Sequence, residues 1–116
     1  MHTISGRAAR VRVYIGEGDH VHGRPLAHAL VLEARRAGLA GVTVFRAVEG
    51  YGASSRLRSS DLLDLSTDLP LVVEIVDTEE RINAALEPLL AMVDGGLVTR
   101  ESVTVLKYAH ARNDRG

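Results

Sequence analysis

The order of the apolar patterns along the chain constrains the fold more than any other feature. Apolar residues that alternate with polar ones, or that form β-branched runs, predict four strands, over residues 11–17, 42–48, 69–77 and 102–108. Apolar residues at spacings of three and four predict one helix after the first strand and another after the third. The order β-α-β-β-α-β predicts an α+β, ferredoxin-like fold, in which two helices cover one face of a four-stranded antiparallel sheet.

Both predicted helices carry start and stop signals. Pro25 stands at a plausible first helical position, and Gly38 follows the last apolar position of the first helix. Asp77 is the predicted cap of the second helix, and a Gly-Gly pair ends it. Pro88 falls inside the second helix, so we expect a kink or an interruption there.

The third predicted strand is apolar on both of its sides. Its two sets of side chains are Leu71, Val73 and Ile75 on one side, and Val72 and Val76 on the other. A two-layer monomer would leave one set exposed to water, so we expect another subunit to cover it. Glu74 lies among these residues and is expected to pair with Arg12 or Arg46 across the sheet rather than to act in catalysis.

Composition narrows the class of protein. The 116 residues predict a single domain, with a core over about 10–108 and frayed tails at 1–10 and 109–116. An aromatic content of 3% and a net charge of −1, without a basic stripe, argue against a nucleic-acid partner. The chain has no cysteine, no apolar run long enough to span a bilayer and no secretory signal, so we expect a cytoplasmic protein that is not embedded in a membrane.

The segment 48–69 is far longer than a hairpin between two strands requires, which makes it the first candidate for function. Glycines allow backbone N–H groups to approach an anion, hydroxyl groups can donate to phosphate oxygens, and an arginine can bind phosphate in a bidentate way. The candidate residues are Gly50, Tyr51, Gly52, Ser54, Ser55 and Arg56. They predict a phosphate-binding segment, although a solvated turn with flexible arginines has a similar composition.

The loop after the first strand is a second candidate, because it leads into the first helix, whose N-terminus favours anions. Its candidate residues are Gly16, Glu17, Gly18, His22, Gly23 and Arg24, and Arg46 joins them from the end of the second strand. Asp19, His20 and His22 could also suggest a metal site. Two histidines without a convincing third ligand are more often solvated, so we expect no metal.

The chain closely resembles the PII-like family catalogued as domain-of-unknown-function family 190. The stretches that carry the resemblance are VYIGEGDHVHGRPL, GLAGVTVFRAVEGYGASS, LSTDLPLVVEIVD and the closing VTVLKY. The resemblance implies a ferredoxin-like homotrimer whose sheets face inward and which binds a small effector, an adenine nucleotide, in clefts between subunits. In the wider PII superfamily a Gly-aromatic-Gly stands at the base of a long effector loop, the T-loop, and Gly50-Tyr51-Gly52 occupies that position here.

The resemblance also implies a signalling role and a partner. Family members are often encoded next to fluoride-channel proteins, so a membrane transporter is the implied docking partner of segment 48–69. One departure from PII proteins concerns the phosphates. PII proteins place further lysine and arginine contacts between the second helix and the last strand, where this chain has VDGGLVTRESV with Arg100 as the sole candidate. AMP or ADP is therefore expected as the effector rather than ATP.

Two alternative functions remain open from the sequence. Acylphosphatases share the β-α-β-β-α-β order and bind phosphate in a loop after the first strand, which would make this chain a hydrolase of acyl phosphates or phosphate esters. Their second strand supplies an asparagine, whereas the only asparagines here are Asn83 and Asn113. No other catalytic grouping is recognisable, so we expect no enzyme. The other alternative is a structural trimer that binds no ligand.

Overall fold

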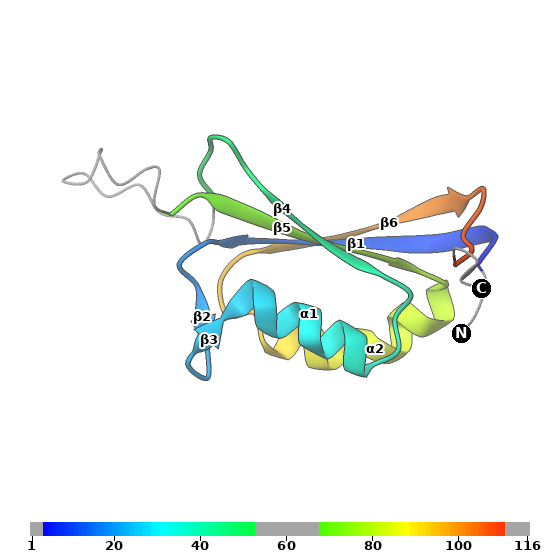
Figure 1. Cartoon of the computed structure of the whole chain (residues 1–116), viewed down its shortest axis with the longest axis horizontal. Coiled ribbons are helices and arrows are strands. Elements are labelled where there is room, and N and C mark those ends of the chain that lie inside the picture. The colour runs from blue at the N-terminus through cyan, green and yellow to red at the C-terminus, as the bar shows by residue number, and fades with distance from the viewer. Residues whose placement is uncertain (1–3, 53–67, 111–116) are drawn as a thin grey trace, which may run out of the picture.

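A computed structural model describes residues 4–52 and 68–110 of the chain. The elements in chain order are β1 (Gly6–Gly16), β2 (His20–Val21), β3 (Arg24–Pro25), α1 (Leu26–Arg36), β4 (Val42–Arg46), β5 (Pro70–Asp77), α2 (Glu79–Ala91) and β6 (Leu97–Val105). Four strands form an antiparallel sheet in the order β4-β5-β1-β6, and β2 pairs with β3 in a small separate hairpin. Both helices lie on the same face of the sheet (Figure 1). The predicted ferredoxin-like α+β fold is confirmed.

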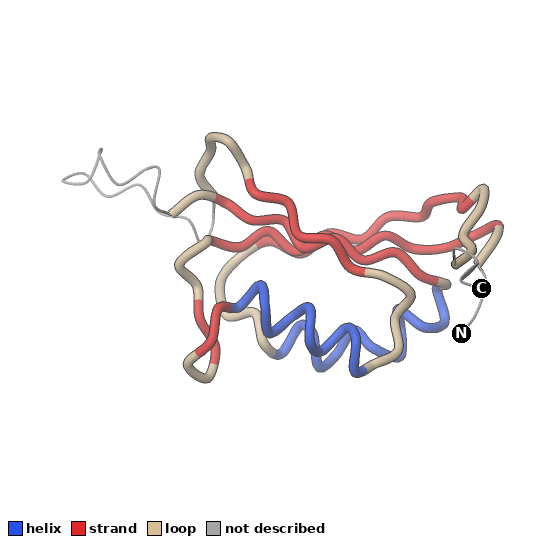
Figure 2. Tube along the Cα trace, viewed as in Figure 1, coloured by secondary structure: helices blue, strands red, loops and turns tan. Residues whose placement is uncertain are grey.

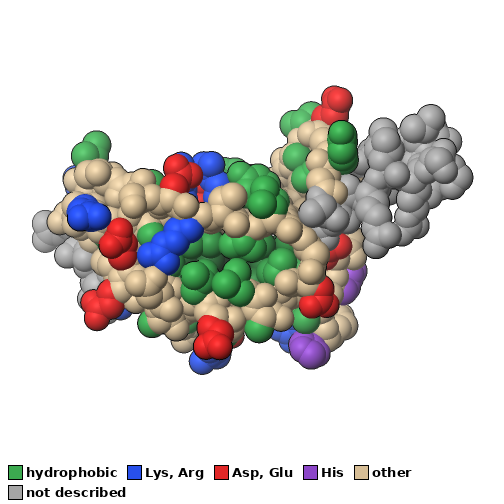
Figure 3. Space-filling model, turned by 180° about the vertical axis from the view of Figure 1, so that it is seen from behind, with side chains coloured by type: hydrophobic (Ala, Val, Ile, Leu, Met, Phe, Trp, Pro, Cys, Tyr) green, Lys and Arg blue, Asp and Glu red, His purple; other side chains and the backbone are tan. Residues whose placement is uncertain are grey.

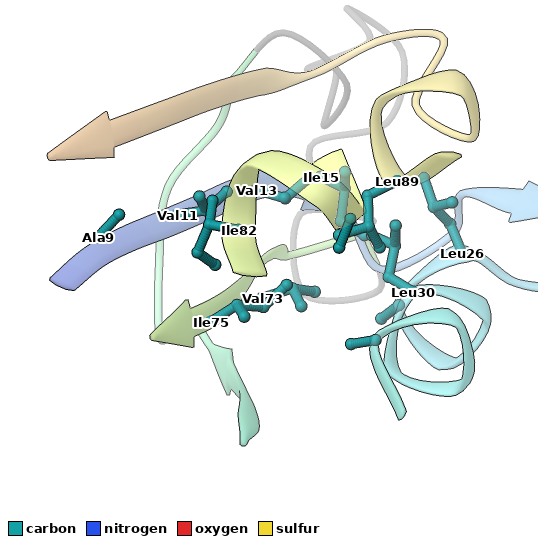
Figure 4. Close-up of a cluster of buried hydrophobic side chains, with 13 residues drawn as sticks. Ala9, Val11, Val13, Ile15, Leu26, Leu30, Val73, Ile75, Ile82 and Leu89 are labelled. Carbon is teal, nitrogen blue, oxygen red and sulfur yellow. The ribbon is translucent and has the colours of Figure 1, made fainter. Parts of the chain in front are cut away.

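The core lies between the sheet and the helices. Alternate residues of β1 (Val11, Val13, Ile15) and of β5 (Val73, Ile75) are buried against α1 and α2. Figure 4 shows these side chains directed toward Leu30 of α1 and toward Ile82 and Leu89 of α2. The period of two in the strands therefore meets the helical period of three and four in one apolar layer, as the sequence patterns require.

The first and last strands differ from their predicted bounds. β1 begins at Gly6, so residues 6–10 are not a frayed tail; they pair with β6, and residues 9 and 10 also pair with β5. Ala8 and Ala9 are almost completely buried there, because small side chains fit the packed end of the sheet. β6 runs over 97–105 rather than 102–108. Most of the stretch predicted as a loop before the last strand is thus already part of the sheet.

Two expectations about α2 need correction: the identity of the cap, and an interruption at Pro88. Thr78, not Asp77, is the cap: its Oγ1 accepts a hydrogen bond from Arg81 N at 3.2 Å. Asp77 is instead fully buried and accepts hydrogen bonds from Ala40 N (2.8 Å) and Thr78 N (2.7 Å), which tie the loop before β4 to the start of α2. Pro88 does not interrupt the helix, which is continuous over 79–91. Pro88 lies on the exposed side of α2, where water can hydrate the carbonyl group that loses its N–H partner.

The sheet face opposite the helices carries both ion pairs and apolar side chains. Arg12 Nε lies 2.9 Å from Glu74 Oε2, which confirms the predicted cross-strand pair and raises the pKa of Arg12 through the hydrogen bond. The strand register also places Phe45, Val72, Tyr14 and Leu97 in one row across this face. Phe45 is 50% exposed and Leu97 is 52% exposed. This open sheet face is therefore partly apolar and is not covered within the described chain.

Candidate functional site

The candidate site lies at the end of the sheet where β1 and β4 finish and β5 begins. In the register, Gly16 at the end of β1 stands opposite Pro70, and Arg46 at the end of β4 stands opposite Leu71. The loop after β1 and both ends of segment 48–69 therefore leave the sheet at the same end (Figure 2). Antiparallel pairing thus brings together two segments that the sequence separates by more than twenty residues.

The loop after β1 is structured by its own hydrogen bonds and contains the hairpin of β2 and β3. His22 and Gly23 both have positive φ (51° and 79°), as the central residues of a two-residue type I′ turn require. The Asp19 carboxylate accepts a hydrogen bond from Gly16 N at 3.0 Å, and Asp19 O accepts one from Leu26 N at 2.8 Å. The loop after β1 is therefore a hydrogen-bonded hairpin that leads into α1.

Segment 48–69 is anchored to this loop at its second end. Glu17 N donates to Leu69 O (2.9 Å), and Gly18 N donates to Asp68 Oδ1 (3.1 Å). Asp68 was not among the predicted site residues. The only sequence signal for it is an acidic residue placed immediately before a strand, which is equally typical of an ordinary turn.

Arg46 is the cation at the centre of the site. Its Nη2 lies 3.0 Å from Glu17 Oε2, and the Arg46 side chain is 58% exposed. An ion pair with this exposure contributes only about 0–1 kcal/mol, because water screens it. The guanidinium group is thus held in position beside the loop while its interaction with Glu17 remains weak enough to be exchanged.

The first end of segment 48–69 lies against the start of β5. Gly50 has φ +149°, and a Cβ atom built there would lie 3.6 Å from Pro70 Cγ. Tyr51 is 78% exposed, and Gly52 has open space around it. Ser54, Ser55 and Arg56 lie outside the described residues, so their predicted role in phosphate binding stays a prediction.

The structure brings some predicted site residues together and separates others. Of the loop after β1, Glu17 contacts Arg46 directly, and Gly16 and Gly50 both lie beside Pro70 at the same end of the sheet. His22, Gly23 and Arg24 belong to the hairpin beside the N-terminus of α1, and in the described part of the chain no hydrogen bond or ion pair links them to Arg46 or Gly50. They do not share one cradle within a single copy of the chain.

Arg100 and the histidine loop have other partners. Arg100 lies in β6, and its Nη1 donates to Asn83 Oδ1 on α2 at 2.6 Å. His20 Nδ1 lies 2.8 Å from Gly18 O, so this nitrogen carries the proton, because a carbonyl oxygen can only accept.

Over residues 4–52 and 68–110, no group of three or more His, Cys, Asp or Glu side chains is arranged to hold a metal ion. No helix in these ranges is both long and apolar enough to cross a bilayer.

A second surface on the molecule is apolar. Figure 3, which views the chain from the side of β6 and α2, shows hydrophobic side chains gathered in a hollow beneath the sheet edge. A shallow depression on α2, with Leu86 and Leu90 in its lining, belongs to this side of the molecule. It contains no cation among its lining residues, so it offers nothing that would recognise a phosphate group.

Comparison with solved structures defines the class of fold. The chain superposes on a putative PII-like signaling protein from Thermus thermophilus with a TM-score of 0.60, at 21% identity and covering 87% of this chain and 91% of that one. It also superposes on CPII from Thiomonas intermedia, in a structure bound to ADP, AMP and acetate, with a TM-score of 0.58, at 18% identity and covering 86% and 89% of the two chains. The chain therefore has the PII-like ferredoxin fold.

Sequence comparison defines the family. The model of the DUF190 family, described as an uncharacterized ACR, matches residues 8–105, and the chain belongs to this family. A UPF0166 protein of Aquifex aeolicus is 40% identical over 96 residues, which cover 83% of this chain and 90% of the relative. A UPF0166 protein of Methanocaldococcus jannaschii is 32% identical over 93 residues, covering 79% and 85%. The predicted resemblance is confirmed.

Proposed function

We propose that this chain is a PII-like regulatory protein and not an enzyme. It binds an adenine nucleotide at the end of the sheet where the 16–18 loop, Arg46 and Gly50 lie. The observation that carries the proposal is the meeting of an exposed arginine with a glycine-containing loop at the base of a long connection. Two structures of similar fold, both of CPII, contain ADP, one with AMP and the other with bicarbonate. These neighbours support an adenine nucleotide as the ligand class.

The chemistry of phosphate recognition centres on Arg46. A guanidinium group binds phosphate oxygens through two parallel charge-assisted hydrogen bonds, which are stronger than its exposed ion pair with Glu17. Gly50 and Gly52 present no side chain, so a ligand can approach the backbone closely. In this proposal Ser54, Ser55 and Arg56 add hydroxyl and guanidinium donors from segment 48–69.

AMP or ADP fits the site better than ATP. Arg100 was the only cation predicted from the segment before the last strand, and it hydrogen-bonds Asn83 on α2 instead. Within one copy of the chain, the segment before the last strand therefore supplies no cation to bind a third phosphate. Additional phosphate charges would remain without a partner, which disfavours the triphosphate.

The site is completed by neighbouring copies in a homotrimer. The exposed apolar row on the open sheet face supports this assembly, because burying it against another copy removes apolar surface from water. Phe45→Ser should weaken association by about 1 kcal/mol per interface, since half of the ring is already buried in one copy. The matched control is Val44→Ser, because Val44 is 39% exposed but points to the opposite face of the same strand. Sedimentation that gives a monomer for the unmodified chain at micromolar concentration would refute the trimer.

Segment 48–69 docks on a partner in the cytoplasm, with a membrane transporter such as a fluoride-channel protein as the proposed partner. The family resemblance and the anchoring of the second end of the segment at the nucleotide site support this step. Co-purification with the transporter should depend on AMP or ADP. A chain in which a short Gly-Ser linker replaces residues 53–67 should lose the partner.

Calorimetric titration of AMP, ADP and ATP tests the nucleotide site. Arg46→Ala should weaken binding roughly ten- to a hundredfold, the range for losing a charge-assisted hydrogen bond of about 1.5–3 kcal/mol. Arg36→Ala is the matched control, because Arg36 also forms an exposed ion pair, with Glu33, at the far end of α1. The absence of heat with all three nucleotides would refute the function. Turnover of a nucleotide or of an acyl phosphate would favour the hydrolase instead.

A further inference from the structure

The glycine-containing loop after β1 has no unused backbone donors at its centre. The N–H groups of residues 16–19 all have acceptors within the chain: Gly16 N donates to Asp19 Oδ2, Glu17 N to Leu69 O, Gly18 N to Asp68 Oδ1 and Asp19 N to Gly16 O. Two of the four acceptors are side-chain carboxylates. An anion can therefore reach an N–H group here only by replacing a carboxylate, because the two backbone carbonyls belong to the framework of the turn and of the β5 anchor.

The guanidinium group of Arg46 likewise already has a carboxylate partner within the chain. Arg46 Nη2 contacts both oxygens of the Glu17 carboxylate, at 3.2 Å and 3.0 Å. Among the described residues of the two loops and their strand ends, the cations are Arg24 and Arg46, whereas the acidic residues are Glu17, Asp19, Glu49 and Asp68. The described part of the site is thus net negative, although its proposed ligand is an anion.

We propose that Glu17 and Asp68 are specificity-determining residues that compete with the phosphate group for Arg46 and for the Gly18 N–H. The proposal rests on the proposed function and names how the same site is regulated. Binding is an exchange of carboxylate for phosphate, and the displaced carboxylates stay nearby as like charges. Each added phosphate increases the negative charge of the ligand. The repulsion between the ligand and these carboxylates therefore grows from AMP to ATP.

The exchange also connects the ligand to segment 48–69. Asp68 and Leu69 anchor the second end of that segment to Gly18 and Glu17. A phosphate that takes the Gly18 N–H removes the Asp68 part of this anchor and leaves the Leu69 part. Ligand binding therefore changes the attachment of the segment through one identified hydrogen bond.

Glu17→Gln and Asp68→Asn test the proposal, because each keeps an oxygen that can accept the same hydrogen bond while it removes the charge. AMP and ATP are titrated without divalent metal into both variants and into the unmodified chain. We expect AMP to bind about three- to tenfold more tightly to each variant, and the gain for ATP to be at least about threefold larger than the gain for AMP. The affinity ratio between AMP and ATP is the decisive quantity, because a merely structural change would alter both ligands equally.

Glu79→Gln is the matched control. Glu79 is also an acidic residue near an arginine, Arg7, but it lies at the start of α2, at the opposite end of β5 from the site. An eight-residue strand spans about 25 Å, which exceeds the screening length of about 8 Å at physiological salt. This variant should leave both affinities unchanged.

The outcomes separate this inference from the proposed function. If the unmodified chain binds neither nucleotide, the proposed function fails and the competition fails with it. If the unmodified chain binds but either site variant shows an equal or weaker affinity, or gains the same factor for AMP and ATP, the competition is refuted while the nucleotide site stands. Tighter binding with a larger gain for ATP in both variants supports the competition.

Discussion

Gly96, between α2 and β6, is predicted to tolerate no side chain without a large loss of stability. Its φ is +145°, and a Cβ atom built on it would lie 2.6 Å from Tyr14 O, a backbone atom of β1 that cannot move without disturbing the sheet. The same Cβ would meet Ile15 Cγ2 and Val93 Cγ1, both at 3.4 Å. Backbone strain at such a φ costs about 1–3 kcal/mol, and overpacking costs a similar amount. We therefore expect Gly96→Ala to lower the free energy of unfolding by about 2–4 kcal/mol.

Two other glycines separate the strain from the close contact. Gly38 has φ +80° with nothing within 4 Å of a built Cβ, so Gly38→Ala should cost only about 1–2 kcal/mol of backbone strain. Gly41 has neither a positive φ nor a neighbour within 4 Å, so Gly41→Ala should be neutral or stabilise by up to about 1 kcal/mol. Urea unfolding of all variants at one protein concentration provides the comparison. Equal losses for Gly96→Ala and Gly38→Ala would show that the contact with β1 does not contribute.

Three further predictions concern the buried Asp77 carboxylate, Arg56 in segment 48–69, and the pH dependence of stability that comes from Glu101. Asp77→Ala should cost about 2–4 kcal/mol in urea unfolding, because it leaves the N–H groups of Ala40 and Thr78 without an acceptor; a loss below about 1 kcal/mol would mean that water replaces the carboxylate. Arg56→Ala should weaken AMP binding roughly ten- to a hundredfold by calorimetry, and equal affinity would leave segment 48–69 as a protein-docking element. The hydrogen bond from Arg10 lowers the pKa of Glu101 below its ordinary 4.5. The stability that this pair contributes to the fold is therefore complete above pH 4.5 and is lost as the pH falls through the lowered pKa. In urea unfolding over this range, the free energy of unfolding of Glu101→Gln should depend less on pH than that of the unmodified chain.

The element order was predictable because each buried element repeats its apolar residues with its own period. Val11, Val13 and Ile15 alternate toward the helices, and Leu30 and Ala34 of α1 repeat at a spacing of four. The strand ends were not predictable, because pairing with neighbours decides them. Residues 6–10 are strand because β6 lies beside all of them, and nothing in the polar and small residues of that stretch indicates it.

The partner of a charged side chain was predictable only where the order of the elements already determined which strands pair. The pair of Arg12 and Glu74 was predictable because both residues stand on strands whose antiparallel pairing the fold order already implied. The pair of Arg100 and Asn83 was not, because it depends on where β6 begins and therefore on which side of the sheet Arg100 points. An error of a few residues in a strand boundary thus changed the expected role of a candidate phosphate ligand.

The glycine-containing loop shows why residue types alone describe a binding site incompletely. From the sequence, Gly16 and Gly18 appear as open backbone donors for an anion, yet the folded chain already supplies acceptors for both N–H groups. This is the general condition of folded backbones, because an N–H group without any partner is costly. The acceptor of Gly18 comes from Asp68, fifty positions along the chain, so no local spacing could reveal it. Affinity at such a loop is consequently a difference between two sets of hydrogen bonds, and removing the internal acid changes that difference as directly as removing the arginine.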